Sequence, residues 1–445
     1  MKKSGFTLIE LLAVIAILAI ILVISIPRIL DVIETSKINA LKNAAQLIAD
    51  SAEKKYAENE AFGEENEITC DSVSKLNKED YCKCSIVFDE NEIAKVSILG
   101  RGKFKGLKVI EATKTNAEVI KLEVPKYGIT AVEYINGLYE YYGDSYNLKI
   151  DNTKDQNVRY YGSDPNNYVS FNNELWRIIG VFGNNVKLVR KDILGKLSWD
   201  SSESGVNYGQ GINQWGESTY EDGTPYEGAD LMQYLNKMYY GGETVTCYGG
   251  QSNATKACPT ETLNDDSKSL IDNHTWNTGA PNRDTLYDST TEAYDTLKFY
   301  QAERSNVNGK NCTSGNGCND TVNRTTTWTG YIGLSYITDY AYASSESDCE
   351  TKIDKSSTYK CKNNNWMQRD DFTWYLSPLA KSECTPGVWC VPNAHDAWVV
   401  TSDGTAGNGL GYSSTAFAPA IYLKSNILIE SGNGSESNPY TLTIS

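Results

Sequence analysis

The chain has 445 residues, of which 41 are basic and 57 are acidic, so its formal net charge is −16 at pH 7. Such an acidic surface would repel a phosphate backbone, and nucleic acid is therefore disfavoured as a partner. His274 and His395 are the only histidines, so neither a multi-histidine metal site nor a paired-imidazole mechanism can be built. Apolar residues make up 40% of the chain, which is enough for a folded core, and the length predicts two or three folded units.

Residues 6–26 form an apolar run whose only charge is Glu10. At about 1.5 Å per residue this run spans about 30 Å, the thickness of the hydrocarbon core of a bilayer. A cleavable secretory signal would have a shorter run followed by a small-x-small site, and no such site precedes Pro27. The two lysines after the first methionine favour a cytoplasmic N-terminus, with the rest of the chain translocated outward.

Glu10 is unusual because a carboxylate inside an apolar helix costs about 2.5–3.5 kcal/mol, so we expect it to have a partner and a role. The segment GFTLIE at residues 5–10 closely resembles the processing signature of type IV prepilins and related pseudopilins. In that family a membrane aspartyl peptidase, the prepilin peptidase, cuts after the glycine, and the new terminal residue is N-methylated. The resemblance implies cleavage after Gly5, methylation of Phe6 and an assembly role for Glu10. The alternative is a plain membrane anchor with an incidental glutamate.

Beyond Pro27, apolar residues recur every three or four positions and therefore share one helix face. We expect Pro27 to kink the helix and not to end it, because the pattern resumes after it. The sequence thus predicts a leader at residues 1–5 and a spine helix at residues 6–58, of which 6–26 span the membrane. A soluble coiled-coil stalk is the alternative for the second half, but the pattern is too short to support it. The predicted buried stripe is Ile38, Leu41, Ala45, Ile48, Ala52 and Tyr56.

Residues 59–126 have the composition of a small antiparallel β unit, and a helix followed by such a sheet resembles the pilin arrangement. Thr130 and Glu133 then form a T-x-x-E capping box, which predicts a short helix. We assign residues 127–157 to this helix and a polar linker. The strands expected in the β unit are Ser85–Asp89, Glu92–Leu99 and Phe104–Ala112.

Residues 158–445 are rich in Asn, Gly, Ser, Thr and Tyr, with short apolar bursts. Their aromatic and Gly/Pro positions resemble the large heads of bacterial prepilin-like and other surface proteins, which look like relatives of the C-type-lectin-like fold. The resemblance implies an extracellular, disulfide-braced head, and for the whole chain an α+β fold class. The elements expected here are a hairpin of Leu175–Phe182 and Val186–Arg190, a helix at Ala229–Tyr239, and strands at Ala397–Thr401 and Phe417–Lys424.

The chain has 11 cysteines, and in a translocated protein this number predicts a disulfide framework. Neighbour pairing is the expected connectivity for the last eight, and a zinc cluster is disfavoured because no C-x-x-C couples exist. Near the β unit we expect Cys70 to pair with Cys82 or Cys84, since a bridge across one residue is strained, which leaves one thiol free or intermolecular. The four expected couples are Cys247 with Cys258, Cys312 with Cys318, Cys349 with Cys361, and Cys384 with Cys390.

Further chemistry in the head is not predicted. The loop Asp151–Asn157 lacks the D-x-D-x-D-G spacing of a calcium site, so we interpret it as an ordinary solvated loop and expect no metal and no cofactor. His395 and Asp396 suggest a dyad, but no G-x-S-x-G elbow places a nucleophile, and we expect no enzyme activity. Most of four tryptophans are interpreted as core residues in preference to a sugar-stacking platform; the four are Trp366, Trp374, Trp389 and Trp398.

Three functional hypotheses remain. The favoured one is a type IV pilin-like subunit, minor because a large head on every subunit would crowd a fibre, that displays its head for adhesion or tip capping. Its partners would be the membrane before assembly, other pilin subunits and a glycan or host-surface ligand. It would be a single-pass membrane protein first and part of an extracellular surface fibre later. The alternatives are a pseudopilin of a secretion or DNA-uptake machine and a membrane-anchored, glycan-active surface enzyme.

Overall fold

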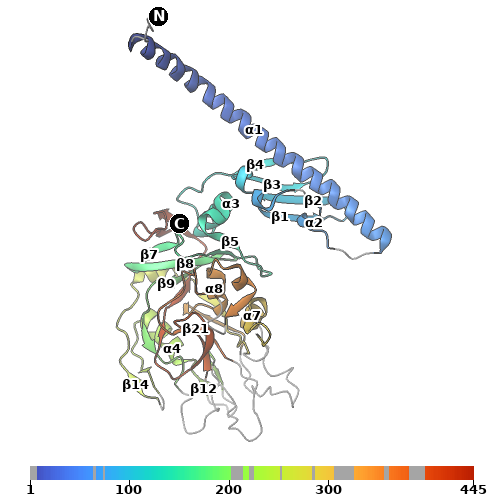
Figure 1. Cartoon of the computed structure of the whole chain (residues 1–445). Coiled ribbons are helices and arrows are strands. Elements are labelled where there is room, and N and C mark those ends of the chain that lie inside the picture. The colour runs from blue at the N-terminus through green and yellow to red at the C-terminus, as the bar shows by residue number, and fades with distance from the viewer. Residues whose placement is uncertain are drawn as a thin grey trace, which may run out of the picture. The chain divides into compact units, whose positions relative to one another are not determined.

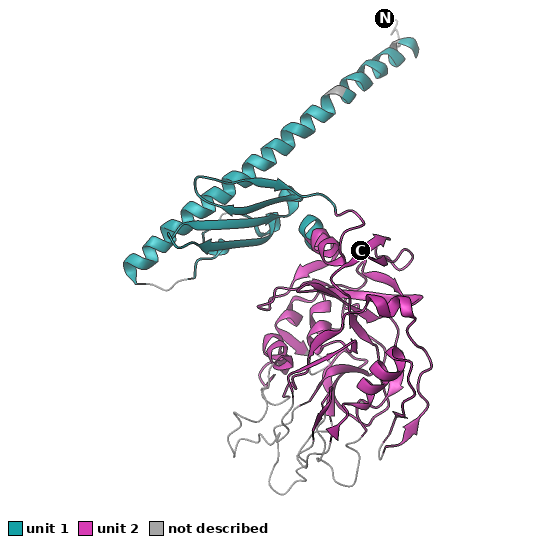
Figure 2. Cartoon of the chain, turned by 180° about the vertical axis from the view of Figure 1, so that it is seen from behind, with its two compact units in different colours: residues 1–124, 140–143 teal, residues 125–139, 144–445 magenta. Residues whose placement is uncertain are grey.

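The computed structural model divides the chain into two compact units (Figure 2). Unit 1 comprises residues 1–124 and 140–143, and unit 2 comprises residues 125–139 and 144–445. The long helix of unit 1 and the β-rich unit 2 together give the α+β class expected from the sequence. The structure describes residues 8–63, 67–73, 76–201, 214–219, 225–250, 253–282, 286–304, 325–354, 360–379 and 396–445.

Unit 1 is built on one helix, α1 (Leu8–Phe62), which continues through Pro27 (Figure 1). At about 1.5 Å per residue its 55 residues extend over about 80 Å. Its second half carries the predicted stripe, and Leu41, Ala45, Ile48 and Ala52 are all buried, as the three-and-four spacing requires.

A four-stranded antiparallel sheet in the order β1-β2-β3-β4 packs on this stripe. In the middle strand Ala94, Val96 and Ile98 are buried against the helix, which confirms the alternation read from the sequence. The fourth strand was not predicted, because three residues are too few to show a period. The elements of the sheet and its connections are β1 (Tyr81–Phe88), β2 (Ala94–Gly100), β3 (Leu107–Ala112), β4 (Val119–Lys121), α2 (Cys70–Val73), η1 (Lys78–Asp80) and η2 (Gly102–Phe104).

The first helix of unit 2 is α3 (Ala131–Tyr142), which starts at the predicted capping box and whose last three residues are assigned to unit 1. The Thr130 hydroxyl accepts from the backbone N–H of Glu133 at 3.2 Å, and the Glu133 carboxylate accepts from the backbone N–H of Thr130 at 3.1 Å. The unit therefore starts earlier than residue 158, where we placed the head. The reason is that residues 127–139 and 144–157 belong to this unit and are structured, not a linker: β5 (Leu148–Ile150) pairs with β6 (Val158–Tyr160).

The largest sheet of unit 2 has seven strands in the order β19-β25-β9-β8-β6-β5, with β7 also paired to β8. Its centre is the predicted hairpin, formed by β8 and β9 in antiparallel register. Both strands are almost fully buried, which explains their continuous apolar runs. The further strands of this sheet are β7 (Tyr168–Phe171), β8 (Glu174–Phe182), β9 (Asn185–Arg190), β19 (Ile332–Gly333) and β25 (Ala420–Tyr422).

A second sheet has five strands in the order β10-β24-β21-β22-β23. The prediction of a strand at Phe417–Lys424 was wrong at its first residue, which ends β24 of this sheet. Residues 417–424 do not form one strand, because the chain leaves β24 at Phe417 and enters β25 of the other sheet at Ala420. Pro419 lies between them and has no N–H to give to a ladder, although its carbonyl accepts from the N–H of Arg190 at 2.9 Å. The strands are β10 (Gly195–Leu197), β21 (Thr373–Pro378), β22 (Asp396–Val400), β23 (Ala406–Leu410) and β24 (Thr415–Phe417).

Smaller elements complete unit 2. The helix predicted at Ala229–Tyr239 is present as α4 (Asp230–Gln233) continued by a π-helical segment, η5 (Tyr234–Tyr240). Other helices are η3 (Gly143–Tyr146, which begins in unit 1), α5 (Asp265–Leu270), α7 (Thr296–Glu303), α8 (Ile337–Ala343) and η6 (Ser347–Glu350). Short pairs and triplets of strands are β11 (Ser218–Thr219) with β12 (Pro225–Tyr226), β13 (Cys247–Tyr248) with β14 (Thr255–Lys256), β15 (His274–Asn277) with β18 (Thr327–Gly330), β16 (Tyr287–Asp288) and β17 (Ala293–Asp295) with β20 (Lys352–Asp354), and β26 (Ile427–Ser431) with β27 (Thr441–Ile444).

Candidate functional site

The first half of α1 exposes a long apolar surface in this chain. Leu8, Ile9 and Val23 have between 74% and 79% of their surface accessible, and the apolar residues between them are also exposed. Among the described residues, α1 is a helix long and apolar enough to cross a membrane. Glu10 lies on α1 within this run, whereas Gly5 and Phe6 lie outside the described residues. The exposed apolar surface requires a lipid or protein environment.

Three disulfides join described residues. Two of them are expected neighbour couples: Cys247 is bonded to Cys258 and Cys349 to Cys361, with Cα atoms 5.3 and 5.6 Å apart. In unit 1 Cys70 is bonded to Cys84, which faces the apolar core, while Cys82 keeps its thiol at 3.9 Å from the carbonyl oxygen of Gly100.

The other two expected couples fall outside the described residues. We predicted that Cys312 pairs with Cys318 and that Cys384 pairs with Cys390, and all four cysteines lie in segments that the structure does not describe. Both pairings therefore stay predictions. The bonds of Cys247 and Cys349 confirm pairing with the next cysteine along the chain for these two couples, which the structure describes.

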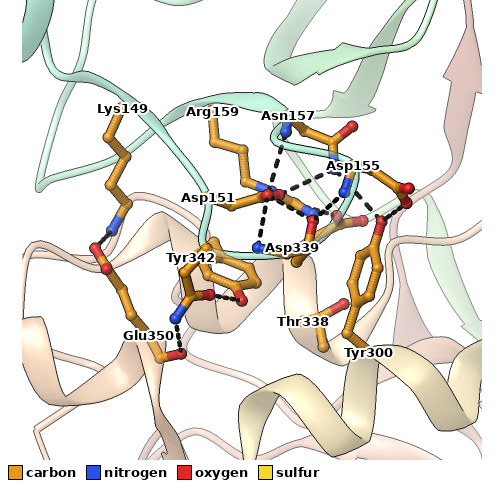
Figure 3. A network of polar contacts seen from close by, with 12 residues as sticks. Lys149, Asp151, Asp155, Asn157, Arg159, Tyr300, Thr338, Asp339, Tyr342 and Glu350 are labelled. Carbon is orange, nitrogen blue, oxygen red and sulfur yellow. Dashed lines mark hydrogen bonds and ion pairs between the residues drawn. The ribbon is translucent and has the colours of Figure 1, made fainter. Parts of the chain in front are cut away.

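Unit 2 contains a network of buried ion pairs, part of which Figure 3 shows. Arg159 Nε lies 2.6 Å from Asp151 Oδ2, and Arg159 Nη1 lies 2.7 Å from Asp339 Oδ1. The other oxygen of Asp339 lies 2.7 Å from Lys187 Nζ. All four side chains have at most 1% of their surface exposed. The network therefore ties β6 and β9 of the large sheet to α8.

The loop Asp151–Asn157, which we interpreted as solvated, is exposed at residues 152 and 154–156, but its first residue is part of this network. Asp151 is 2% exposed, and its Oδ1 accepts from the backbone N–H groups of Thr153 and Asn157 at 3.2 and 3.1 Å. The loop wraps around this carboxylate because Arg159 neutralises its charge, so burial is no longer prohibitive. Among the described residues, no group of three or more His, Cys, Asp or Glu side chains is arranged to hold a metal ion.

The pKa values of the buried carboxyl groups differ according to their partners. Burial by itself would raise the pKa of Asp339, but the charges of Lys187 and Arg159 outweigh it and hold this pKa at about 2. Burial raises the pKa of Glu303 to about 7, although Arg304 and hydrogen bonds from Thr338 partly oppose it. Asp339 is therefore an ionised structural anchor and not an acid–base group at neutral pH.

A cavity of about 510 Å³ beside α4 contains a second kind of carboxyl environment. Asp200 and Asp230 both line it, and Asp230 Oδ2 accepts from the backbone N–H of Ser201 at 2.7 Å. Burial, followed by the negative charge of Asp200, raises the pKa of Asp230 to about 7. Asp230 thus changes its charge near neutral pH, unlike Asp339.

The tryptophans expected in the core are buried where the structure describes them. Trp374 and Trp398 have at most 1% of their surface exposed, and Trp366 has 9%. Trp389 and His395 lie outside the described residues, whereas Asp396, the other half of the suggested dyad, is buried in β22.

Sequence reasoning missed the ion-pair network, because Arg159 and Asp339 are 180 residues apart in the chain. The available signal was local: Arg159 is the one cation of β6, and Lys187 lies between apolar residues inside β9, whose last residue is the cation Arg190. A lone cation in a buried strand indicates a carboxylate partner, but it does not identify which one.

Comparison with known proteins gives a match at the N-terminus. Residues 1–26 match the family model of the prokaryotic N-terminal methylation motif. No curated protein and no solved structure matches the chain. The motif, continued by the exposed apolar part of α1, defines a type IV pilin-like N-terminal signal, which indicates processing by prepilin peptidase and assembly with other pilin subunits.

Proposed function

We propose that this protein is a minor subunit of a type IV pilin-like surface fibre, cut after Gly5 and methylated at Phe6, whose unit 2 is displayed for adhesion or for capping the tip. The observation that carries the proposal is the methylation motif at residues 1–26, of which residues 8–26 lie in the exposed apolar half of α1. This surface is covered by lipid before assembly and by the same helices of other subunits afterwards.

Glu10 gives the assembled helices their register in this proposal. Within the fibre its carboxylate is removed from water, and the charged amino group of Phe6 from a neighbouring subunit neutralises it. An incorrectly spaced helix would leave both charges unpaired in an apolar surrounding. Cleavage after Gly5 is needed for this pairing, because it creates the amino group.

Unit 2 supports a role in contact with other surfaces. It forms most of the chain, two disulfides brace it among the described residues, and its β-rich architecture is compatible with the proposed relation to C-type-lectin-like domains. A unit of this size would crowd a fibre if every subunit carried it, which favours a minor subunit. We propose that unit 2 binds its target without chemical turnover.

The test is mass spectrometry of the N-terminus of this protein in surface fibres sheared from cells. We expect a mature chain that begins with N-methylated Phe6. Glu10→Ala should leave processing intact and reduce the amount of this subunit in the fibres at least tenfold. The matched control is Glu58→Ala, an exposed acidic residue on the same helix outside the apolar run, which should not change incorporation.

Two results would redirect the proposal. An uncut chain that stays in the membrane fraction would identify a plain anchor. A cut and methylated chain that is absent from sheared fibres but present in the cell envelope would identify a pseudopilin, the second candidate, which shares the same motif.

A further inference from the structure

A second cavity in unit 2, of about 460 Å³, has a different chemical character from the acidic cavity beside α4. It lies where β8 and β9 meet the segment that precedes β21, and arginine and aspartate side chains dominate its lining. Its volume is in the range of small-molecule sites. Four basic residues line it in a chain that has more acids than bases overall, so its charge balance is unusual for this protein.

Arg369 contributes a positive charge whose hydrogen bonds go to main-chain carbonyls and not to a described carboxylate. Its Nη1 and Nη2 groups donate to the main-chain carbonyls of Lys191 and Arg190, which are neutral acceptors. A guanidinium has five N–H donors, so three of them remain for a ligand. Burial lowers the pKa of Arg369, and the nearby charge of Asp192 opposes this only in part, although an arginine remains charged at neutral pH.

Arg177 offers a second set of unused donors in the same cavity. The side chain is 8% exposed, and its guanidinium stacks at 3.9 Å on the ring of Tyr168. Its Nε donates to Asn167 at 2.7 Å and its Nη2 to Asp164 at 3.1 Å, whereas its Nη1 donates to no described residue. The stacking and these hydrogen bonds, with a third from Nη2 to the main-chain carbonyl of Pro165 at 3.1 Å, hold this guanidinium rigidly, so little entropy is lost when it binds a ligand.

The aspartates of the cavity restrict the class of ligand. Asp192 and Asp370 line it together with the arginines, whereas Asp371 is already paired with Lys196. A polyanion would be repelled by the two aspartates, but a molecule with one carboxylate and several hydroxyl groups satisfies both kinds of side chain. Arginine binds a carboxylate through paired N–H donors, and aspartate accepts hydrogen bonds from hydroxyl groups.

We propose that this cavity binds a carboxylate-bearing sugar of an acidic glycan, with Arg177 and Arg369 on the carboxylate and Asp192 and Asp370 on the hydroxyl groups. The inference deepens the proposed adhesive role of unit 2 by naming the class of its ligand, and it rests on that role. It assigns no metal to the site, because two guanidinium groups supply the positive charge.

The experiment measures binding of 3′-sialyllactose and digalacturonic acid, with lactose as the neutral reference, to the detergent-solubilised full chain by saturation-transfer NMR and tryptophan fluorescence. We expect at least one acidic sugar to bind at least tenfold more tightly than lactose. Arg369→Gln should weaken this binding at least tenfold, and the charge-retaining Arg369→Lys should weaken it less. Lys268→Gln, a surface cation outside the cavity, is the matched control and should leave it unchanged.

Asp370→Asn protects the test against misfolding, because this exposed side chain can be changed without altering the core. It should weaken binding of the acidic sugar about threefold to tenfold. The proposal is overturned if neither acidic sugar binds better than lactose, or if Arg369→Gln and Asp370→Asn both leave binding unchanged. Equally tight binding of a heparin tetrasaccharide would also contradict it, since a polyanion would then fit the cavity.

This outcome is separable from that of the proposed fibre role. Sugar binding is measured on purified protein and needs no assembly, so a failure of fibre incorporation leaves it standing. Conversely, a cavity that binds no acidic sugar leaves processing after Gly5 and incorporation into the fibre untouched.

Discussion

The two units differ in what their cores contain, because both have exposed ion pairs but unit 2 also has fully buried ones. In unit 1 the core between α1 and its sheet is apolar, and ion pairs such as Lys121–Glu34 lie at the surface with about half of each side chain exposed. In unit 2 Arg159, Lys187 and Asp339 pair inside the core with at most 1% of each side chain exposed. Ion pairs therefore lie in water at the surface of unit 1, and in unit 2 some of them lie in an apolar interior.

The difference shows how the surroundings determine what an ion pair contributes. An exposed pair contributes about 0–1 kcal/mol, because water and salt screen it. A buried pair gains little over apolar residues of the same volume, but the loss of one partner leaves a charge without compensation and costs about 3–5 kcal/mol. We infer that the network of unit 2 adds little net stability. Its main effect is to favour one arrangement of β6, β9 and α8, because any other arrangement leaves a buried charge unpaired.

The largest expected effect comes from breaking this network. Asp339→Ala should lower the free energy of unfolding of unit 2 by about 3–5 kcal/mol, since Arg159 and Lys187 lose their shared anion. Chemical denaturation followed by tryptophan fluorescence reports the unfolding of unit 2 alone, because all 9 tryptophans of the chain lie beyond residue 175, in this unit.

Lys121→Ala in unit 1 provides the comparison, because it removes one partner of an exposed pair. The opening free energy of β4, measured by the hydrogen exchange of its backbone amides, should then fall by about 0–1 kcal/mol. If Asp339→Ala and Lys121→Ala destabilised their own units equally, the contrast between buried and exposed pairs would be wrong.

An intermediate effect is expected from the apolar core of unit 1. Leu41→Ala should destabilise this unit by about 2–4 kcal/mol, because the removed side chain is fully buried against the sheet. Hydrogen exchange of β2 and β3 should accelerate, while the tryptophan signal of unit 2 stays unchanged. The control is Leu47→Ala on the same helix, where the side chain is 66% exposed and the cost should be below about 0.5 kcal/mol. A similar effect of both substitutions would show that helix propensity, and not packing, holds α1 on the sheet.

Among the buried groups, the smallest effect concerns pH and sharpens the contrast within unit 2. The folded-state pKa of Asp230 is raised to about 7 from an ordinary value near 3.8, so the native state retains this proton while the unfolded state loses it. Stability should therefore fall as pH rises from about 4 to about 7, by about 1–2 kcal/mol from this group. Denaturant midpoints at pH 4.5 and pH 8 measure the change.

Asp230→Asn should flatten this dependence, whereas Asp265→Asn, which alters an exposed carboxylate on α5, should not. Burial raises the pKa of Glu303 to about 7 as well. Glu303 contributes equally to the pH dependence of stability in every variant, so the difference between the wild-type chain and Asp230→Asn reports Asp230. An unchanged slope in Asp230→Asn would show that its carboxyl group is already ionised at pH 5.

Local patterns predicted the elements whose energetics are local. The capping box of α3 is present because Thr130 and Glu133 are three residues apart and need no other part of the chain. The hairpin of β8 and β9 is also present, because two apolar runs flank a short Gly-Asn-Asn turn. Local reasoning was wrong at residues 417–424, since the choice between two sheets at Pro419 depends on strands far away in the sequence.

The sequence by itself determined the α1 helix, its buried stripe and the N-terminal signal, because the apolar spacing, the length of the run and the residues at positions 5–10 are all local properties. Only the tertiary structure decided which charges of unit 2 meet, and that Asp151 is buried. The physical reason is that burying a charge is tolerable only with its partner in place, and Lys187 is 152 residues from Asp339. The same holds for the cavity of Arg177 and Arg369, whose residues meet only in the folded chain.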